Sequence, residues 1–355
     1  MRRVCIFYCT VGDDVLALCR FGEVDDLFFV LCGTGVCIVF QNHDSFLLPL
    51  FPSKYGRGDA RHGDGAGKTV WPMEVKENIE VLICTVDEGI RRVPDVLSPT
   101  VRGDVRYLVS FQYTDKKWLE AVPEMLKRRA DVKIVALAGR GLSVNRNHAF
   151  DHSSGDIVLV ADDDSRYRDR YFDAVQRTFA SNRDVDIALF RGKSHEGHWL
   201  KRYPETACEW ASAPRWTYAS SWEMAVRRRA LARGVRFNEH FGLGSEYLAS
   251  GEEDVFLSDA VGAGLRIVYF PETVVETDGD TTGGHFLDNV RVQRSKGAVF
   301  CYRYGTFGAA FRCAKEAFGY FVRRGVNPLP LMRNMTDGIR YCRRINDGKS
   351  RRRRG

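Results

Sequence analysis

From position 79 onward, apolar residues fall into short β-type runs that alternate with segments of helical spacing. The compact runs predict strands at residues 79–86, 105–111, 132–137, 156–161 and 187–190. Spacings of three and four predict helices at residues 116–129, 169–180 and 255–263, and residues 264–272 read as a turn followed by a strand. Strands that alternate with helices predict an α/β fold with a mostly parallel sheet.

Three consecutive acids, Asp162, Asp163 and Asp164, follow the fourth predicted strand. Ligands of such sheets bind beyond the carboxyl ends of the strands, where these side chains would lie. Neighbouring carboxylates repel one another unless a cation neutralises them, and oxygen ligands suit Mg²⁺ or Mn²⁺. A solvated acidic turn or a helix cap explains the same residues, so the triplet alone leaves both interpretations open.

A second acidic group, Glu252, Glu253 and Asp254, follows Gly251 and opens the predicted helix at residues 255–263. Acids are favourable at any helix start because of the helix dipole. The position therefore indicates chemistry only in combination with the first acidic group.

The first seventy residues lack this regular pattern. Residues 27–40 form an apolar run, which is shorter than the ~20 residues that span a bilayer. Residues 56–67 carry five glycines and predict a flexible linker. Gly67-Lys68-Thr69 within it is no phosphate loop, because the pattern needs glycine where His62 stands. We expect residues 1–72 to be an N-terminal extension, either poorly ordered or foreign to the native protein.

The formal net charge is +7, with 53 Lys and Arg against 46 Asp and Glu. Residues 340–355 hold eight basic side chains and one acid, so this basic tail alone accounts for the net charge. The neutral remainder argues against nucleic acid as a partner, because phosphate tracking needs a broad basic face. The tail either holds the protein near an anionic membrane or is a solvated end.

Residues 306–339 predict an amphipathic helical segment. Apolar residues recur near helical spacing between basic ones, at Phe307, Phe311, Ala314, Phe318, Phe321 and Val322. Such a helix either lies on a membrane surface or packs on the body of the protein.

The ten cysteines form no C-x-x-C pair and no cluster with histidine. This pattern disfavours zinc sites and a disulfide framework, and it favours reduced thiols in the cytosol. We expect a cytoplasmic protein, with peripheral contact to the inner face of the membrane through the C-terminal segment.

Taken together, the two acidic groups resemble those of the family 2 glycosyltransferases with the GT-A fold. The resemblance is carried by IEVLICTVD at residues 79–87, GLSVNRNHAF at 141–150, GDIVLVADDD at 155–164 and the GEEDVFL helix start at 251–257. It runs from about residue 79 to about residue 300. It implies a Rossmann-like three-layer sandwich with a mostly parallel central sheet, in a domain over residues 73–305.

The resemblance also implies an inverting transfer from a nucleotide sugar, with UDP-sugars favoured, to a hydroxyl of a saccharide or lipid-linked acceptor in polysaccharide or glycoconjugate synthesis. It assigns Thr85, Asp87, Arg146 and Asp162 to the donor. Asp164, together with Asp162 of the DxD motif, would bind Mg²⁺ or Mn²⁺. Asp254 would be the general base, with Glu253 beside it. A surface arginine that caps a turn is the other interpretation of Arg146.

Four of the six tryptophans lie within residues 199–222. Because aromatic faces stack on sugar rings, Trp216 and Trp222 are candidates for an acceptor site, although core packing explains them equally well. Two other functions use a similar site: a sugar nucleotidyltransferase, and an inactive sugar-nucleotide-binding protein. The first would carry a Gly-rich basic loop after residue 86, which the sequence lacks, and the retained acids argue against the second.

Overall fold

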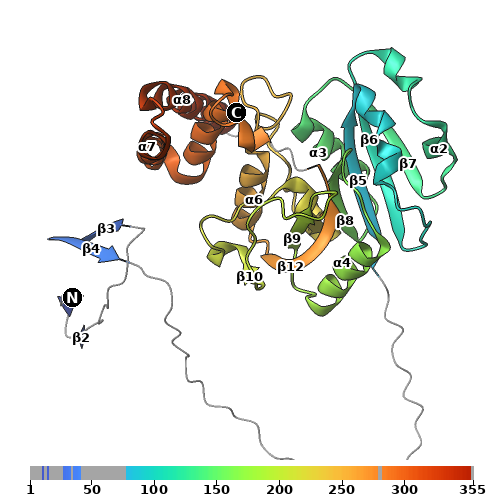
Figure 1. Ribbon diagram of the computed structural model, residues 1–355, viewed down its shortest axis with the longest axis horizontal. Helices are drawn as coiled ribbons and strands as arrows, with labels where there is room; N and C mark the ends of the chain where they lie inside the picture. The colour runs from blue at the N-terminus through green and yellow to red at the C-terminus, as the bar shows by residue number, and fades with distance from the viewer. Residues whose placement is uncertain are drawn as a thin grey trace, which may run out of the picture. The chain divides into compact units, whose positions relative to one another are not determined.

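The predicted apolar runs form the centre of an eight-stranded sheet in the computed structural model (Figure 1). The structure describes residues 77–278 and 282–352, and before them only residues 10–11, 14–15, 27–32 and 35–40. In spatial order the strands of the sheet are β10 (Cys208–Glu209), β12 (Ile267–Glu276), β9 (Ile187–Lys193), β11 (Met224–Arg227), β8 (Ile157–Asp162), β5 (Ile79–Val86), β6 (Val105–Tyr113) and β7 (Val132–Ala138).

Parallel pairing dominates this sheet. Strands β7, β6, β5 and β8 run parallel to one another in that order, and β9 is parallel to β12. Only β11 and β10 pair antiparallel with their neighbours. Val105 and Ile157 both align with Ile79, and Cys84 aligns with Asp162 at the other end. The predicted mostly parallel sheet is therefore confirmed, although the short strands β10 and β11 were not predicted.

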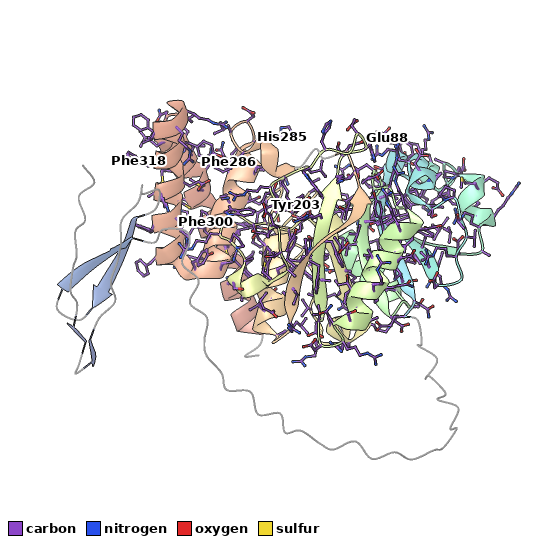
Figure 2. The ribbon with its side chains drawn as sticks, turned by 60° about the horizontal axis from the view of Figure 1, so that its bottom comes forward. Glu88, Tyr203, His285, Phe286, Phe300 and Phe318 are labelled. Carbon is purple, nitrogen blue, oxygen red and sulfur yellow. The ribbon has the colours of Figure 1, made fainter. Side chains whose placement is uncertain are left out.

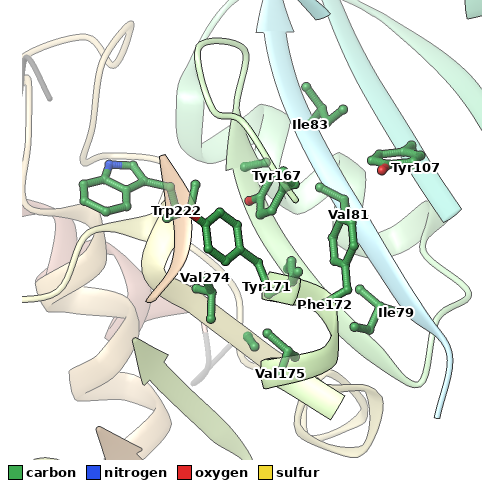
Figure 3. Close-up of a cluster of buried hydrophobic side chains, with 14 of the residues drawn as sticks. Ile79, Val81, Ile83, Tyr107, Tyr167, Tyr171, Phe172, Val175, Trp222 and Val274 are labelled. Carbon is green, nitrogen blue, oxygen red and sulfur yellow. The ribbon is translucent and has the colours of Figure 1, made fainter. Parts of the chain in front are cut away.

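Alternate residues of β5 face two hydrophobic layers. Ile79, Val81 and Ile83 belong to one hydrophobic cluster that includes side chains of α4 (Asp169–Ser181) (Figure 3). The intervening residues face α3 (Leu142–His152) and α6 (Glu252–Gly262) on the opposite side. This period of two, which follows from the alternation of strand side chains, gives the predicted three-layer sandwich.

The single helix predicted at residues 116–129 is wrong. Two short segments stand there, η2 (Lys116–Leu119) and α2 (Glu124–Arg128), and Pro123 between them has φ −57° and ψ 135°. Proline lacks the amide hydrogen that would continue the helix. The other short helical segments are η1 (Asp87–Arg91), α1 (Val93–Val96), η3 (Trp210–Ser212), η4 (Ser221–Glu223), α5 (Arg228–Ala232) and η5 (Thr282–His285).

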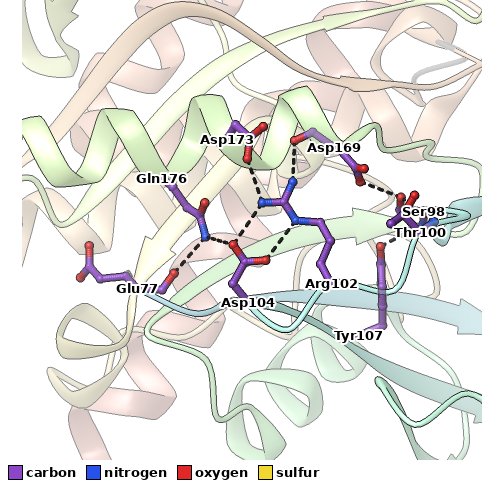
Figure 4. Close-up of polar contacts among 9 residues, drawn as sticks. All are labelled: Glu77, Ser98, Thr100, Arg102, Asp104, Tyr107, Asp169, Asp173 and Gln176. Carbon is purple, nitrogen blue, oxygen red and sulfur yellow. Dashed lines mark hydrogen bonds and ion pairs between the residues drawn. The ribbon is translucent and has the colours of Figure 1, made fainter. Parts of the chain in front are cut away.

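A polar network at the amino ends of β5 and β6 fastens α4 to the sheet (Figure 4). Arg102 donates to Asp104 at 3.0 Å and to Asp173 at 2.8 Å, and Gln176 donates to Asp104 at 3.0 Å. This network lies at the amino ends of the strands, on the side of the sheet opposite the carboxyl ends. It therefore stabilises the layers without taking part in a ligand site.

Helices α7 (Val290–Arg324) and α8 (Pro328–Arg352) pack side by side (Figure 1). They cross at glycines, because a Cβ at Gly297 would collide with the carbonyl of Met335. Gly305, with φ 69°, bends α7 close to the predicted boundary between residues 73–305 and 306–339. Helix α8 continues across residue 340, so no structural break separates segment 306–339 from the tail predicted at 340–355. No helix in the described part of the chain has the length and apolarity to cross a bilayer.

Residues Met1–Trp71 form a unit separate from residues Pro72–Gly355. In it, β1 (Thr10–Val11) pairs with β2 (Asp14–Val15), and β3 (Leu27–Cys32) pairs with β4 (Gly35–Phe40), both antiparallel. The apolar run at residues 27–40 thus contains two paired strands. The linker predicted at residues 56–67, like most of the extension predicted at 1–72, lies outside the described residues.

Candidate active site

The ends of β5 and β8 are joined by the middle acid of the first triplet. Asp163 accepts a hydrogen bond from Thr85 Oγ1 at 2.6 Å and pairs with Arg92 Nη2 at 2.6 Å. Gly89 lies against Asp163 and Thr85, since a Cβ there would collide with both side chains. Asp163, in the turn that follows β8, therefore fixes the ends of β5 and β8 relative to each other.

Asp87 links β5 to β6. Its backbone has φ 50°, in the left-handed region that is unusual for residues other than glycine. Its carboxylate accepts hydrogen bonds from Thr114 N and Thr114 Oγ1, both at 2.7 Å. The predicted donor residue Asp87 thus stands at the carboxyl end of the sheet, with its side chain held by a neighbouring strand end.

Arg146 brings the two acidic groups together. It is only 2% exposed, and it donates from α3 to Asp162 at 3.2 Å, to Glu252 at 3.1 Å and to Glu253 at 3.4 Å. Ser221 Oγ accepts a further hydrogen bond at 2.5 Å. The interpretation of Arg146 as a surface residue is therefore wrong, because a buried arginine with three carboxylates is the electrostatic centre of the site.

The backbone before α6 sets the direction of the second acidic group. Gly251 has φ 88°, and a Cβ there would collide with Val299 of α7. Ser295 Oγ, also from α7, accepts a hydrogen bond from Ala249 N at 2.9 Å. The first half of α7 therefore clamps the loop that leads into α6.

The three acids of α6 point to different surroundings. The Glu252 side chain is 6% exposed and the Glu253 side chain 21%, and both face Arg146. The Asp254 side chain is 41% exposed and pairs with Arg303 Nη1 of α7 at 3.0 Å. Burial raises the pKa of Glu252 and of Glu253, and the Arg146 charge opposes that rise. Asp254 is thus the most accessible of the three carboxylates.

Asp164 and Asp162 form the carboxylate pair of the first triplet. Burial raises the pKa of Asp164, the charge of Asp162 raises it further, and a hydrogen bond with Thr277 lowers it. Two carboxylates in this relation gain from a cation between them. Among the described residues, no three His, Cys, Asp or Glu side chains are grouped closely enough to hold a metal ion by themselves.

A buried ion pair behind the site had no signal in the sequence. Lys201 pairs with Glu223 at 2.5 Å, and Tyr203, labelled in Figure 2, donates to the same carboxylate at 2.6 Å. Burial lowers the pKa of Lys201, which the charges of Glu223 and Glu253 oppose. Lys201 lies in an irregular segment and Glu223 ends the three-residue η4, so no periodic pattern connects them.

The two candidate acceptor tryptophans differ in their surroundings. Trp222 is 6% exposed and packs on Gly192 of β9, where a Cβ would collide with its ring. Trp216 is 37% exposed, and the Arg202 guanidinium lies 4.1 Å from its ring centroid. Trp222 is therefore part of the core, whereas Trp216 offers a ring face to a ligand.

Comparison with known proteins identifies the class. Residues 116–245 match the family model described as glycosyl transferase family 2. Among solved structures, the chain resembles S. aureus TarS 1-349 in complex with UDP-GlcNAc at 17% identity and a TM-score of 0.52, over 73% of this chain and 79% of that chain. It also resembles S. aureus TarS 1-349 at 17% identity and a TM-score of 0.49, over 70% of this chain and 72% of that chain. No curated protein matches the chain significantly.

The sheet, the two helical layers and the structural similarity confirm the predicted GT-A fold. The family match covers the segment with Arg146 and the acids at residues 162–164, and it confirms the resemblance to family 2 glycosyltransferases. The protein is a glycosyltransferase.

Proposed function

We propose that the chain is an inverting glycosyltransferase that moves a sugar from a UDP-sugar to a hydroxyl group of a saccharide or lipid-linked acceptor. The observation that carries this proposal is the position of Arg146, which joins Asp162 at a strand end to Glu252 and Glu253 at a helix start. UDP is favoured because a structure with the same fold, that of S. aureus TarS 1-349, holds UDP-GlcNAc.

The donor lies across the carboxyl ends of β5 and β8 in this proposal. Thr85 and Asp87 stand at the end of β5 and contact the nucleoside. Asp162 contacts the ribose, and Arg146 supplies positive charge beneath the diphosphate. The links from Asp163 to Thr85 and from Thr114 to Asp87 keep both contacts in place before the donor binds.

Asp162 and Asp164 fit a single divalent cation. Mg²⁺ is commonly held by one or two protein carboxylates together with substrate phosphates, so a pair of acids suffices. The raised pKa of Asp164, which comes from burial and from the Asp162 charge, is the mark of a pair that a cation would relieve. A bound Mg²⁺ or Mn²⁺ would stabilise the negative charge that develops on the leaving diphosphate.

Asp254 acts as the general base that takes the proton from the acceptor hydroxyl. It is the accessible acid of α6, and Arg303 orients its carboxylate. Glu253 lies beside it and is held by Arg146. A positioned carboxylate that accepts this proton contributes roughly 10²–10⁴-fold to the rate.

A direct displacement needs no covalent enzyme intermediate. The Cys84 thiol has Arg146, Asp162 and Asp163 among its charged neighbours. Burial raises the pKa of Cys84 to about 12, so it stays protonated and unreactive near neutral pH. This supports a single displacement with inversion at the anomeric carbon.

The acceptor side lies over the start of α6. Trp216 is the ring that stacks on the acceptor sugar, and the buried Trp222 supports that region from below. A saccharide or lipid-linked acceptor, used in polysaccharide or glycoconjugate synthesis, would place the enzyme in the cytoplasm or peripherally at the inner face of the membrane.

Incubation with a panel of UDP-, GDP-, ADP- and dTDP-sugars, each with Mn²⁺ or Mg²⁺, tests the proposal by release of the nucleoside diphosphate. We expect the fastest release from a UDP-sugar, loss of release with a chelator, and strong impairment in Asp164→Asn. Asp184→Asn is the control, because the Asp184 side chain is 73% exposed and pairs only with Arg266 in a surface contact. No release from any donor would contradict the proposal.

A further inference from the structure

The outer side of the second half of α7 carries a continuous apolar face, which we call the α7 stripe. Phe307 is 92% exposed, Phe311 73% and Phe318 62%. These residues follow one another at spacings of four and seven, so they share one side of the helix. Figure 2 shows Phe318 projecting from α7. The members of the stripe are Phe307, Phe311, Phe318, Phe321 and Val322.

The inner side of the same half-helix is built from small residues. Ala309, Cys313 and Ala317 are fully buried and belong to the cluster that α7 forms with α8. A helix that only supports a core would place its large aromatics inward and its small or polar residues outward. Here the order is reversed, so the large side chains are arranged for contact with something outside the helical pair.

Positive charge borders the stripe. Residues 306–324 contain four basic side chains and one acid, Glu316. Arg312, Lys315 and Arg323 follow one edge of the stripe by their helical positions, and all three are exposed. Exposed aromatic side chains beside a cationic edge match an anionic lipid surface, in which rings enter the headgroup layer and basic groups meet phosphates.

The stripe begins beside the acceptor side of the site. Arg303 lies four residues before Phe307, on the other side of the bend at Gly305, and it is the residue that pairs with Asp254 at 3.0 Å. Any surface that holds the stripe therefore also holds the start of α6 close to it. A lipid-linked acceptor would reach Asp254 along the same surface without leaving the bilayer.

We propose that the α7 stripe inserts into the headgroup region of an anionic bilayer and sets the active site at the lipid surface. The inference rests on the proposed function for the nature of the acceptor, whereas vesicle binding itself does not depend on it. Since no described helix can cross a bilayer, the stripe lies in the plane of the interface.

Cosedimentation of the full chain with vesicles tests the proposal, using phosphatidylcholine with and without 30% phosphatidylglycerol. Phe307→Ser, Phe311→Ser and Phe318→Ser together should lower binding to the mixed vesicles by at least about a hundredfold. The matched triple change of the same residues to Leu should keep most of the binding. Changing Arg312, Lys315 and Arg323 to Gln should lower binding about fivefold per residue, and only when phosphatidylglycerol is present.

Depth is read separately with Phe318→Trp, whose fluorescence should be quenched by brominated lipids. A control tryptophan at exposed Val101 should not be quenched. Full vesicle binding by the Ser triple, or absence of wild-type binding, overturns the proposal. So does a Ser triple that converts a dimer to a monomer and leaves vesicle binding unchanged, because a second copy would then cover the stripe.

Two readouts separate this inference from the proposed function. The Ser triple should release nucleoside diphosphate from a soluble donor at the wild-type rate. If the wild-type chain binds vesicles through the stripe but releases nothing from any donor, the proposed function fails and the membrane surface stands.

Discussion

The protein carries two runs of three consecutive acids, and the backbone under each run gives them different surroundings. At residues 162–164 the chain leaves β8 and enters a turn, and the first two carboxylates meet different partners. Asp162 meets Arg146, whereas Asp163 meets Thr85 and Arg92. At residues 252–254 the chain enters a helix, and successive side chains rotate by about 100°.

The two runs share one arginine and differ in which carboxylates do not contact it. Arg146 takes one carboxylate from the first run and two from the second. Each run also gives one acid to a more exposed arginine, Asp163 to Arg92 and Asp254 to Arg303. Two similar runs of acids thus yield a strand-end pair suited to a cation and a helix-start acid suited to a proton, because the secondary structure sets the direction of each side chain.

Removing the shared arginine should have the largest effect. Arg146→Met leaves Asp162, Glu252 and Glu253 without their buried cation, and we expect a loss of about 3–5 kcal/mol in the free energy of unfolding. Turnover should fall at least about a hundredfold. Arg177→Met is the control for the loss of an arginine, because Arg177 lies on the exposed surface of α4.

The stability of Arg146→Met should also recover as the pH falls. Burial already raises the pKa values of Glu252 and Glu253, and loss of the arginine raises them further. For an acid with a raised folded pKa, stability is highest below its unfolded pKa and is lost as pH rises toward the folded pKa. Denaturant melts between pH 4 and 8 measure this. A variant whose deficit does not shrink toward pH 4 would show that the arginine acts by packing alone.

The direction of the second acid run depends on Gly251. Gly251→Ala places a Cβ in the left-handed region and against Val299, so we expect about 1–2 kcal/mol of destabilisation and a turnover loss of about tenfold. Gly262→Ala in the same helix has open space around the new Cβ and should be neutral or stabilising. Equal behaviour of the two variants in thermal melts would show that the loop before α6 is not held as described.

The smallest expected effect comes from removing the buried ion pair of Lys201 and Glu223, which lies near Glu253. Changing Lys201 to Met and Glu223 to Gln together removes a buried pair without leaving either charge alone. Because Lys201 and Glu253 attract each other, loss of the lysine should raise the pKa of Glu253. The titration profile of the Glu253 carboxyl carbon, followed by NMR, should therefore move to higher pH by a few tenths of a unit. Lys127→Met on the surface should leave the profile unchanged.

The parallel strands and the positions of both acid runs could be predicted from local pattern. Strands such as residues 79–86 are buried on both faces, so they appear in the sequence as continuous apolar runs that are easy to recognise. Acids that directly follow such a strand must stand at its carboxyl end. The helix at residues 116–129 failed because Pro123 takes an extended conformation that the apolar spacing does not reveal. Strand β11 has four residues, too few for a period to appear.

The connections within the site could not be predicted in the same way. Arg146, Ser221 and Arg303 come from three different elements. The two arginines meet the acids, and Ser221 meets Arg146, only when the layers pack. The split between Trp222 in the core and Trp216 at the surface likewise depends on Gly192, which lies in another strand. Sequence pattern identifies the chemistry-bearing residues, and tertiary contact decides which way each one faces.

The most direct test separates the two acids next to each other in α6. Asp254→Asn and Glu253→Gln are each assayed for release of nucleoside diphosphate in the presence of acceptor, and for donor binding by calorimetry. We expect Asp254→Asn to abolish turnover and to bind the donor as the wild type does, because its carboxylate acts only on the acceptor. Full turnover by Asp254→Asn would contradict the assignment of this residue as the general base.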